Sequence, residues 1–131
     1  MTRTIVLDAG AVIAAERNDP ALVALVKSAR LRDAIVLIPA GVLAETWRGP
    51  STNPRVARLL KTVDDFPPLD ADCAKRIGTL LGATRSASPV DASVAEVALR
   101  YAPSLVATSD PADIRALLQH APRGAVSIYT I

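Results

Sequence analysis

The sequence has few of the residues that build several common kinds of site. Cys73 is the only cysteine and His120 the only histidine among 131 residues, which excludes an internal disulfide and a cysteine-rich zinc site. One tryptophan, two tyrosines and one phenylalanine are too few for the aromatic platforms of RNA-recognition sheets or single-strand-binding barrels. No apolar run approaches the roughly 18 residues of a membrane span. We therefore expect one soluble cytoplasmic domain over residues 1–131, without membrane association or redox chemistry.

Charge is nearly balanced, but it is unevenly distributed. The formal net charge is +2, which is too small to indicate nucleic-acid binding by itself. The stretch from Arg48 to Lys61 also contains Arg55 and Arg58 and has no acid. We interpret it as a surface for RNA phosphates, with a partner-binding surface, a dimer contact or a plain solvated face as the alternatives.

Apolar runs alternate with amphipathic stretches along the whole chain. The apolar runs predict strands at residues 4–7, 34–38, 104–107 and 127–130, with a weaker extended segment at 65–69. Helical spacing and capping residues predict helices at residues 11–16, 40–48, 53–62 and 70–82, and others that begin at residues 19, 88 and 110. This alternation favours the α/β class, as a three-layer α/β/α sandwich around a mostly parallel, five-stranded sheet.

Four acids lie near the predicted ends of strands. Asp8 directly follows the first strand, Asp110 lies within three residues of the strand at 104–107, and Glu45 lies in the helix after the second strand. Asp91 falls in the first turn of its helix. Ligand sites of parallel sheets gather at the carboxyl ends of the strands. Carboxylates that converge there repel one another and normally hold a hard cation, for which Mg²⁺ is the best fit.

Each acid also has a structural alternative. Asp110 before Pro111 has the form of a helix N-cap, and Ser88 with Asp91 three residues later resembles a capping box. Glu45 is equally consistent with an ordinary solvated helix acid. Asp8 is the hardest to explain structurally, because it follows a buried strand and precedes small residues.

Four segments of the chain resemble the motifs of one family. IVLDAGAVIA at residues 5–14, VLAETWRG at 42–49, SPVDASVAEVA at 88–98 and VATSDPADIRAL at 106–117 resemble, in order and spacing, the motifs of PIN domains. The VapC toxins of bacterial type II toxin–antitoxin pairs are the most similar group. The resemblance covers essentially the whole chain.

The resemblance implies both a fold and an activity. It implies that the strands at 4–7 and 104–107 are adjacent at the centre of the sheet. It also implies a Mg²⁺- or Mn²⁺-dependent endoribonuclease, a hydrolase of RNA phosphodiesters, that forms homodimers. The implied partner is a VapB-type antitoxin, whose carboxy-terminal segment wraps the toxin and blocks the acidic pocket.

The resemblance also assigns roles to residues. It places the catalytic set at Asp8, Glu45, Asp91 and Asp110, and the metal ligands at Asp8, Asp91, Asp110 and Asp113. Ser109 matches a polar neighbour of the site, and we expect it to contact substrate together with Arg48, Arg55 and Arg58. Asp113 also lies where a capping-box acid would stand. Ser88 replaces an aspartate common in VapC-like sequences, which leaves open whether one or two ions bind.

In the mechanism that we expect, Glu45 orients or deprotonates the attacking water, while the metal offsets charge on the phosphate. Trp47 and Tyr101 lie in helical apolar patterns, and we expect them to be packing or interface residues. We expect Cys73 in the core and His120 on the surface.

Three other functions are compatible with parts of the pattern. A phosphoaspartyl receiver usually has paired acids after the first strand and a lysine after the last, and both are missing. A haloacid-dehalogenase-type phosphatase needs an aspartate where this chain has Gly10. A PIN-fold module that binds RNA or protein without cleavage is the stronger alternative, although the intact set of four acids argues against it.

Overall fold

The computed structural model describes residues 3–84 and 87–131. In this part of the chain, four parallel strands form one sheet in the order β2-β1-β3-β4. The strands are β1 (Thr4–Leu7), β2 (Ile35–Leu37), β3 (Ser104–Thr108) and β4 (Val126–Thr130). The predicted adjacency of the first strand and the strand at 104–107 is confirmed, because β1 pairs with β3 from Thr4 opposite Ser104 to Leu7 opposite Ala107.

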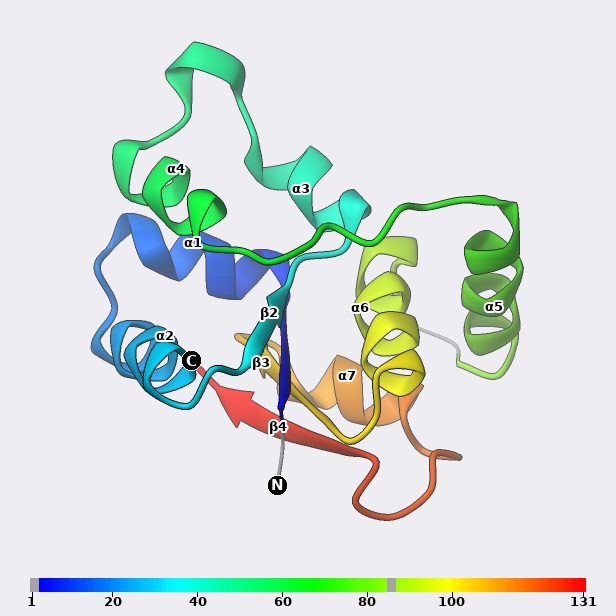
Figure 1. The fold of residues 1–131 in the computed structure, drawn as a ribbon. Coiled ribbons are helices and arrows are strands. Elements are labelled where there is room, and N and C mark those ends of the chain that lie inside the picture. The colour runs from blue at the N-terminus through cyan, green and yellow to red at the C-terminus, as the bar shows by residue number, and fades with distance from the viewer. Residues whose placement is uncertain (1–2, 85–86) are drawn as a thin grey trace.

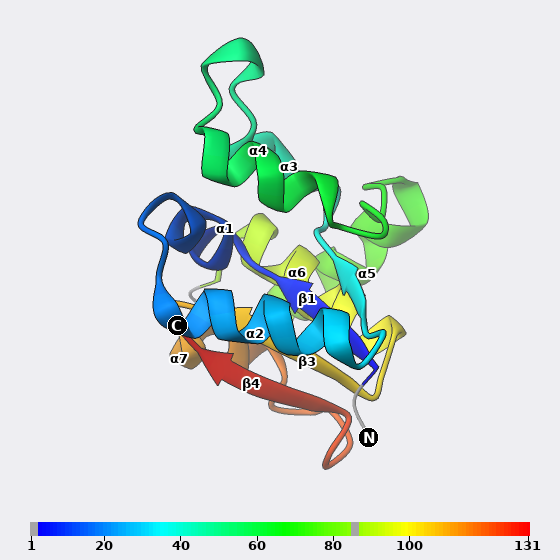
Figure 2. The same cartoon turned by 60° about the vertical axis from the view of Figure 1, so that its left-hand side comes forward.

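Helices cover both faces of the sheet, as the three-layer prediction requires. Figure 1 shows α1 and α2 on one side and α6 and α7 on the other, and Figure 2 shows α2 running across its face of the sheet. The helices are α1 (Ala9–Glu16), α2 (Pro20–Leu31), α3 (Ala40–Thr46), α4 (Pro54–Lys61), α5 (Ala71–Gly82), α6 (Pro89–Arg100) and α7 (Pro111–Leu117), with a 3₁₀ turn at Gly49–Ser51. Within the described part, none of them is long and apolar enough to cross a membrane.

The core lies where β1 and α6 pack together. All four residues of β1 are buried, and so is every residue of α6 from Ala92 to Ala98. Burying a single large aliphatic side chain stabilises the fold by about 1.5–3 kcal/mol. The packing of β1 against α6 therefore fixes the positions of the residues at their ends. Asp8 directly follows β1, and Asp91 lies in the first turn of α6.

The predicted fifth strand is replaced by a single bridge. Residue Asp65 pairs with Leu37 of β2 in a parallel bridge, and Ala40 donates a backbone hydrogen bond to the Pro67 carbonyl. Pro67 and Pro68 lack the N–H groups that a continued ladder needs. The five-stranded prediction is therefore corrected to four strands and a bridged edge segment.

The helix predicted at residues 40–48 ends earlier, at Thr46. Trp47 takes an extended conformation, with φ −81° and ψ 133°, and turns the chain away from the helix axis. Figures 1 and 2 show that the segment between α3 and α4 then projects away from the sheet.

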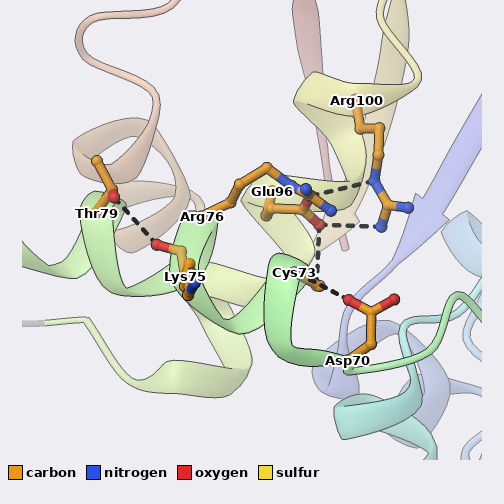
Figure 3. Close-up of polar contacts among 7 residues, drawn as sticks. All are labelled: Asp70, Cys73, Lys75, Arg76, Thr79, Glu96 and Arg100. Atoms are coloured by element: carbon orange, nitrogen blue, oxygen red, sulfur yellow. Dashed lines mark hydrogen bonds and ion pairs between the residues drawn. The ribbon is translucent and has the colours of Figure 1, made fainter.

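A buried carboxylate fastens α5 to α6 (Figure 3). Glu96 is 3% exposed and accepts hydrogen bonds from Arg76 Nε at 2.6 Å and Arg100 Nη2 at 3.1 Å. The Cys73 thiol donates to the same carboxylate at 3.4 Å, so Cys73 lies in the core as predicted. Burial, and then the hydrogen bond and charge of Glu96, raise the pKa of this thiol. Asp70 caps the start of α5 by accepting from the Cys73 N–H at 2.8 Å.

Candidate metal centre

Asp8 is the buried centre of the candidate site. It is 5% exposed, and its Oδ1 accepts a hydrogen bond from the Ala11 N–H at 2.8 Å, which makes it the N-cap of α1. Burial raises the pKa of its carboxyl; hydrogen bonds from Thr108 and Ala11 oppose the rise, and the charges of Asp91 and Asp110 add to it. A nearby cation stabilises the ionised form of a carboxylate in this setting.

Thr108 links the two central strands at the site, and reasoning from the sequence missed it. It is the last residue of β3 and is fully buried. Its hydroxyl hydrogen-bonds the Asp8 carboxyl and accepts from the Asp110 N–H at 2.8 Å. The available signal was a hydroxyl residue at the end of the strand that pairs with β1, two residues before an acid.

Asp110 occupies the N-cap position of α7, but its carboxylate does not cap the helix. The side chain makes no capping hydrogen bond, and it is exposed. Asp113 lies in the first turn of the same helix. The pKa of Asp113 is raised first by a side-chain hydrogen bond with Asp110, then by the charges of Asp110 and Asp91. The capping alternative for Asp110 is therefore wrong, and its carboxylate is available to the rim of the sheet.

Asp91 faces the same rim from α6. The hydroxyl of Ser88 accepts a hydrogen bond from the Asp91 N–H at 3.1 Å, so Ser88 caps α6 and supplies one half of the predicted capping box. The carboxylate of Asp91 accepts no hydrogen bond within residues 3–84 and 87–131. Its charge contributes to the raised pKa of both Asp8 and Asp113.

The donor chemistry of these aspartates fits a hard cation. Asp8, Asp91, Asp110 and Asp113 supply only oxygen ligands, and they repel one another, as the pKa shifts of Asp8 and Asp113 record. Mg²⁺ and Mn²⁺ favour carboxylate and water oxygens. In the part of the chain that the structure describes, no three His, Cys, Asp or Glu side chains are arranged as a group that could hold a metal ion. The fit rests on the chemistry of the carboxylates and on their shared rim.

Gly10 allows a close approach in the turn after Asp8. A Cβ atom at this position would overlap the Ser109 hydroxyl, and it would stand 2.8 Å from the Ser109 Cβ and 3.4 Å from Asp8 Oδ1. Ser109, predicted as a polar neighbour of the site, therefore lies against this turn beside Asp8. The functional reason for a glycine at this position was not visible in the sequence alone.

Glu45 flanks the rim from α3. This helix packs against α1 and α6, and a Cβ on its Gly41 would lie 3.7 Å from Ser93 Oγ of α6. Glu45 itself is exposed. The charges that raise the pKa of Asp8 are those of Asp91 and Asp110, without Glu45. The structure thus brings four aspartates to one rim and leaves the glutamate on a neighbouring helix.

The predicted basic residues divide between two places. Arg48 is exposed at the end of α3, where its Nη1 donates to the Trp47 carbonyl at 2.7 Å and the Ala44 carbonyl at 3.3 Å. Arg55 donates from Nη1 to the Glu16 carbonyl at 2.8 Å. Arg55 and Arg58 line a hollow of about 360 Å³ whose lining includes none of the four rim aspartates.

This hollow lies between α2 and α4 and combines apolar and basic groups. Its apolar lining includes Leu22, Val26 and Leu59. Its cations are Lys27, Arg30, Arg55 and Arg58, and no acid lines it.

Comparisons with known proteins agree with the fold. A sequence profile of the family described as PIN domain matches residues 5–117. The crystal structure of FitAcB from Neisseria gonorrhoeae is similar, with a TM-score of 0.64 and 18% sequence identity, over 96% of this chain and 96% of that chain. No curated protein matches the sequence. At this identity, the structural likeness supports the fold alone.

Proposed function

This chain belongs to the PIN-domain family, and on that premise we propose that it is a Mg²⁺- or Mn²⁺-dependent endoribonuclease, the toxin of a VapC-type toxin–antitoxin pair. PIN domains are generally nucleases. The metal, the RNA substrate and the toxin role are the parts that we propose for this member.

One observation carries the proposal. Asp8 is buried at the carboxyl end of a central strand, and burial together with the charges of Asp91 and Asp110 raises its pKa. A buried carboxylate beside like charges costs stability unless a cation joins it. A carboxyl group whose pKa is raised in this way is typical of a functional site rather than of a helix cap.

The aspartates would hold the ion. Asp8, Asp91 and Asp110 are its proposed ligands, directly or through water, with Asp113 as a further ligand. A Mg²⁺ or Mn²⁺ ion bound there would supply positive charge to the phosphate that is attacked. Asp8 is fixed by the hydrogen bonds from Ala11 and Thr108, so its carboxylate needs little reorganisation to bind.

Glu45 would orient or deprotonate the attacking water, because it stands on a helix that packs beside the rim and carries no hydrogen bond that would occupy it within the described residues. Ser109 and Arg48 would contact the RNA beside the scissile phosphate, and Arg55 and Arg58 would hold phosphates further along the strand. In-line attack by the water breaks the P–O bond to the leaving oxygen, which takes up a proton.

An antitoxin is the second proposed partner. The hollow between α2 and α4 offers apolar lining residues ringed by four cations and no acid, which suits an amphipathic protein segment that carries carboxylates. We propose a VapB-type antitoxin for this surface and a homodimer as the toxin's own assembly. Co-purification with the product of a small gene directly upstream would support the pair, and loss of that complex in Leu59→Glu would place the contact in the hollow.

Cleavage of RNA tests the proposed activity. Purified protein should degrade a pool of RNA in the presence of Mn²⁺ or Mg²⁺, stop when EDTA is added, and lose activity in Asp8→Asn. Unchanged cleavage by Asp8→Asn would remove the metal-site assignment. Metal binding without cleavage of any RNA in the pool would instead favour the alternative of a non-catalytic PIN-fold binding module.

A further inference from the structure

Trp47 is an aromatic side chain without a structural role in the described fold. It is the only tryptophan of the chain and is 50% exposed. It belongs neither to the buried core nor to the partly buried residues packed against the core. The sequence pattern predicts a packing or interface residue at this position, and the half-exposed residue does not fill the packing role in the described fold. A large exposed aromatic is a common mark of a binding surface.

Its position relates it to the rim of aspartates. Trp47 is the C-cap residue of α3, the helix that carries Glu45 and packs against α1 and α6. Asp8 is the N-cap residue of α1, and Asp91 lies in the first turn of α6. A helix of seven residues is about 10 Å long, so the indole stands about one short helix away from the contact between α3 and α6. A strand of RNA several nucleotides long is long enough to reach both places.

The local backbone holds this residue in a fixed setting. The Trp47 N–H donates to the Leu43 carbonyl at 2.9 Å. The next residue, Arg48, donates its backbone N–H to Thr52 Oγ1 at 2.7 Å and one guanidinium nitrogen to the Trp47 carbonyl at 2.7 Å. These hydrogen bonds hold the backbone of two adjacent residues, one with an aromatic and one with a guanidinium side chain.

The surroundings of Trp47 favour a nucleic acid over a protein. From Trp47 to Lys61 the chain has four cations and no acid, namely Arg48, Arg55, Arg58 and Lys61. The residues that follow Arg48 are small or polar; a Cβ on Gly49 would meet no atom within 4 Å, and Ser51 is exposed. A protein interface usually surrounds such an anchor with further apolar residues. Single-stranded nucleic acids are bound by aromatic faces beside a positive groove.

We propose that Trp47 and Arg48 form a nucleotide platform for single-stranded RNA, in which the indole stacks on a base near the scissile phosphate and the guanidinium contacts a neighbouring phosphate. This inference rests on the proposed ribonuclease function and names how that site grips its substrate. It assigns no base preference, because stacking accepts every base.

Binding can be measured separately from cleavage. Because Trp47 is the only tryptophan, its fluorescence reports directly on the platform. A 12-nucleotide, fluorescein-labelled RNA of mixed sequence is titrated with protein in EDTA, which prevents metal-dependent cutting. We expect saturable quenching of the tryptophan, matched by a rise in the anisotropy of the RNA.

Substitutions of Trp47 then separate the effect of an aromatic ring from that of an apolar side chain. Trp47→Leu should weaken RNA binding about tenfold, whereas Trp47→Phe should stay within about threefold of the parent. The matched control is Tyr101→Leu, which removes another exposed aromatic, 37% exposed, from the far end of α6 and should leave binding unchanged. Circular dichroism confirms that each variant is folded.

Three results would overturn the platform. One is the absence of tryptophan quenching by RNA that binds, another is equal affinity of Trp47→Leu and the parent, and the third is a changed oligomeric state of Trp47→Leu in sedimentation with unchanged RNA affinity. The last would assign Trp47 to a protein interface. A protein that binds RNA through Trp47 but never cleaves it would refute the proposed ribonuclease and leave the platform standing.

Discussion

At the scale of residues, the site depends on how the charge of Asp8 is held. The carboxylate has a buried position, two hydrogen bonds that favour its ionised form, and two neighbouring aspartates that oppose it. Burial outweighs the hydrogen bonds, since the net effect on the pKa is upward. Asp8 is thus a helix cap and a candidate metal ligand at once, and the cap fixes the carboxylate in place for the ligand role.

The ionised Asp8 should destabilise the metal-free protein. Its pKa is higher in the folded chain than the ordinary value of 3.8, so the folded state holds the proton to higher pH than the unfolded state does. The stability from this group is present at low pH and is lost as pH rises through the window above 3.8. Asn can still cap α1. In EDTA, Asp8→Asn should therefore raise the free energy of unfolding at pH 7 by about 1 kcal/mol, or about 4 °C in Tm.

Melting curves followed by circular dichroism at pH 4 and pH 7 measure this effect. The difference in Tm between Asp8→Asn and the parent should be smaller at pH 4 than at pH 7. A lower Tm for Asp8→Asn than for the parent at pH 7 in EDTA would show that the carboxylate is not under electrostatic strain.

Thr108 should set the pH dependence of cleavage. Thr108→Val removes the hydroxyl that hydrogen-bonds Asp8 and accepts from the Asp110 N–H. Loss of the bond to the ionised form should raise the pKa of Asp8 further. The acidic limb of the cleavage profile should then move to higher pH, and Thr108→Ser should restore it. A profile that keeps its shape while the rate falls uniformly would assign Thr108 a packing role instead.

At the scale of elements, most of the fold could be predicted from the sequence, because the sequence of each central strand or helix fits only one type of secondary structure. β1 and β3 are apolar runs, and the dipeptides Asp-Pro and Ser-Pro predict where helices begin. The segment at residues 65–69 could not be resolved by pattern, since Pro67 and Pro68 reduce an apolar stretch to one bridge. Capping and ligation both place an acid at a helix start, so only the structure separated Asp110 from a true cap.

The link between α5 and α6 was also missed, for a physical reason. Glu96 lies within the apolar run of α6, where a sequence pattern predicts a core position and gives no partner. The partners Arg76 and Cys73 come from α5, about twenty residues earlier in the chain. Only the tertiary structure shows that hydrogen-bond donors from α5 pair with this acid.

Glu96 should therefore matter for stability and not for chemistry. Glu96→Ala leaves two partly exposed guanidiniums without their carboxylate, and the free energy of unfolding should fall by about 2–3 kcal/mol. Cleavage per folded molecule should be unchanged. Urea unfolding measures the loss, with the exposed Asp72→Ala on the same helix as control. A stable Glu96→Ala protein with impaired cleavage would contradict the structural role.

At the scale of the whole molecule, the sheet divides the surface into areas with different tasks. The carboxyl edge gathers the aspartates, α3 places Glu45 and the Trp47 platform beside it, and the hollow between α2 and α4 lies apart from the rim. We infer that substrate and antitoxin would compete for Arg55 and Arg58, which line the hollow and are also the proposed contacts for RNA phosphates. Glu96 fastens α5 to α6, the helix whose first turn carries Asp91.

The most direct test of the metal centre is the binding of Mn²⁺, measured as loss of the free-ion signal in electron paramagnetic resonance. The parent protein should bind Mn²⁺, and Asp8→Asn should weaken binding at least about tenfold, as loss of a ligand or of its support commonly does. Asp72→Asn, which removes an exposed acid away from the rim, should bind like the parent. Equal Mn²⁺ affinity of Asp8→Asn and the parent, or no binding by the parent, would contradict the account.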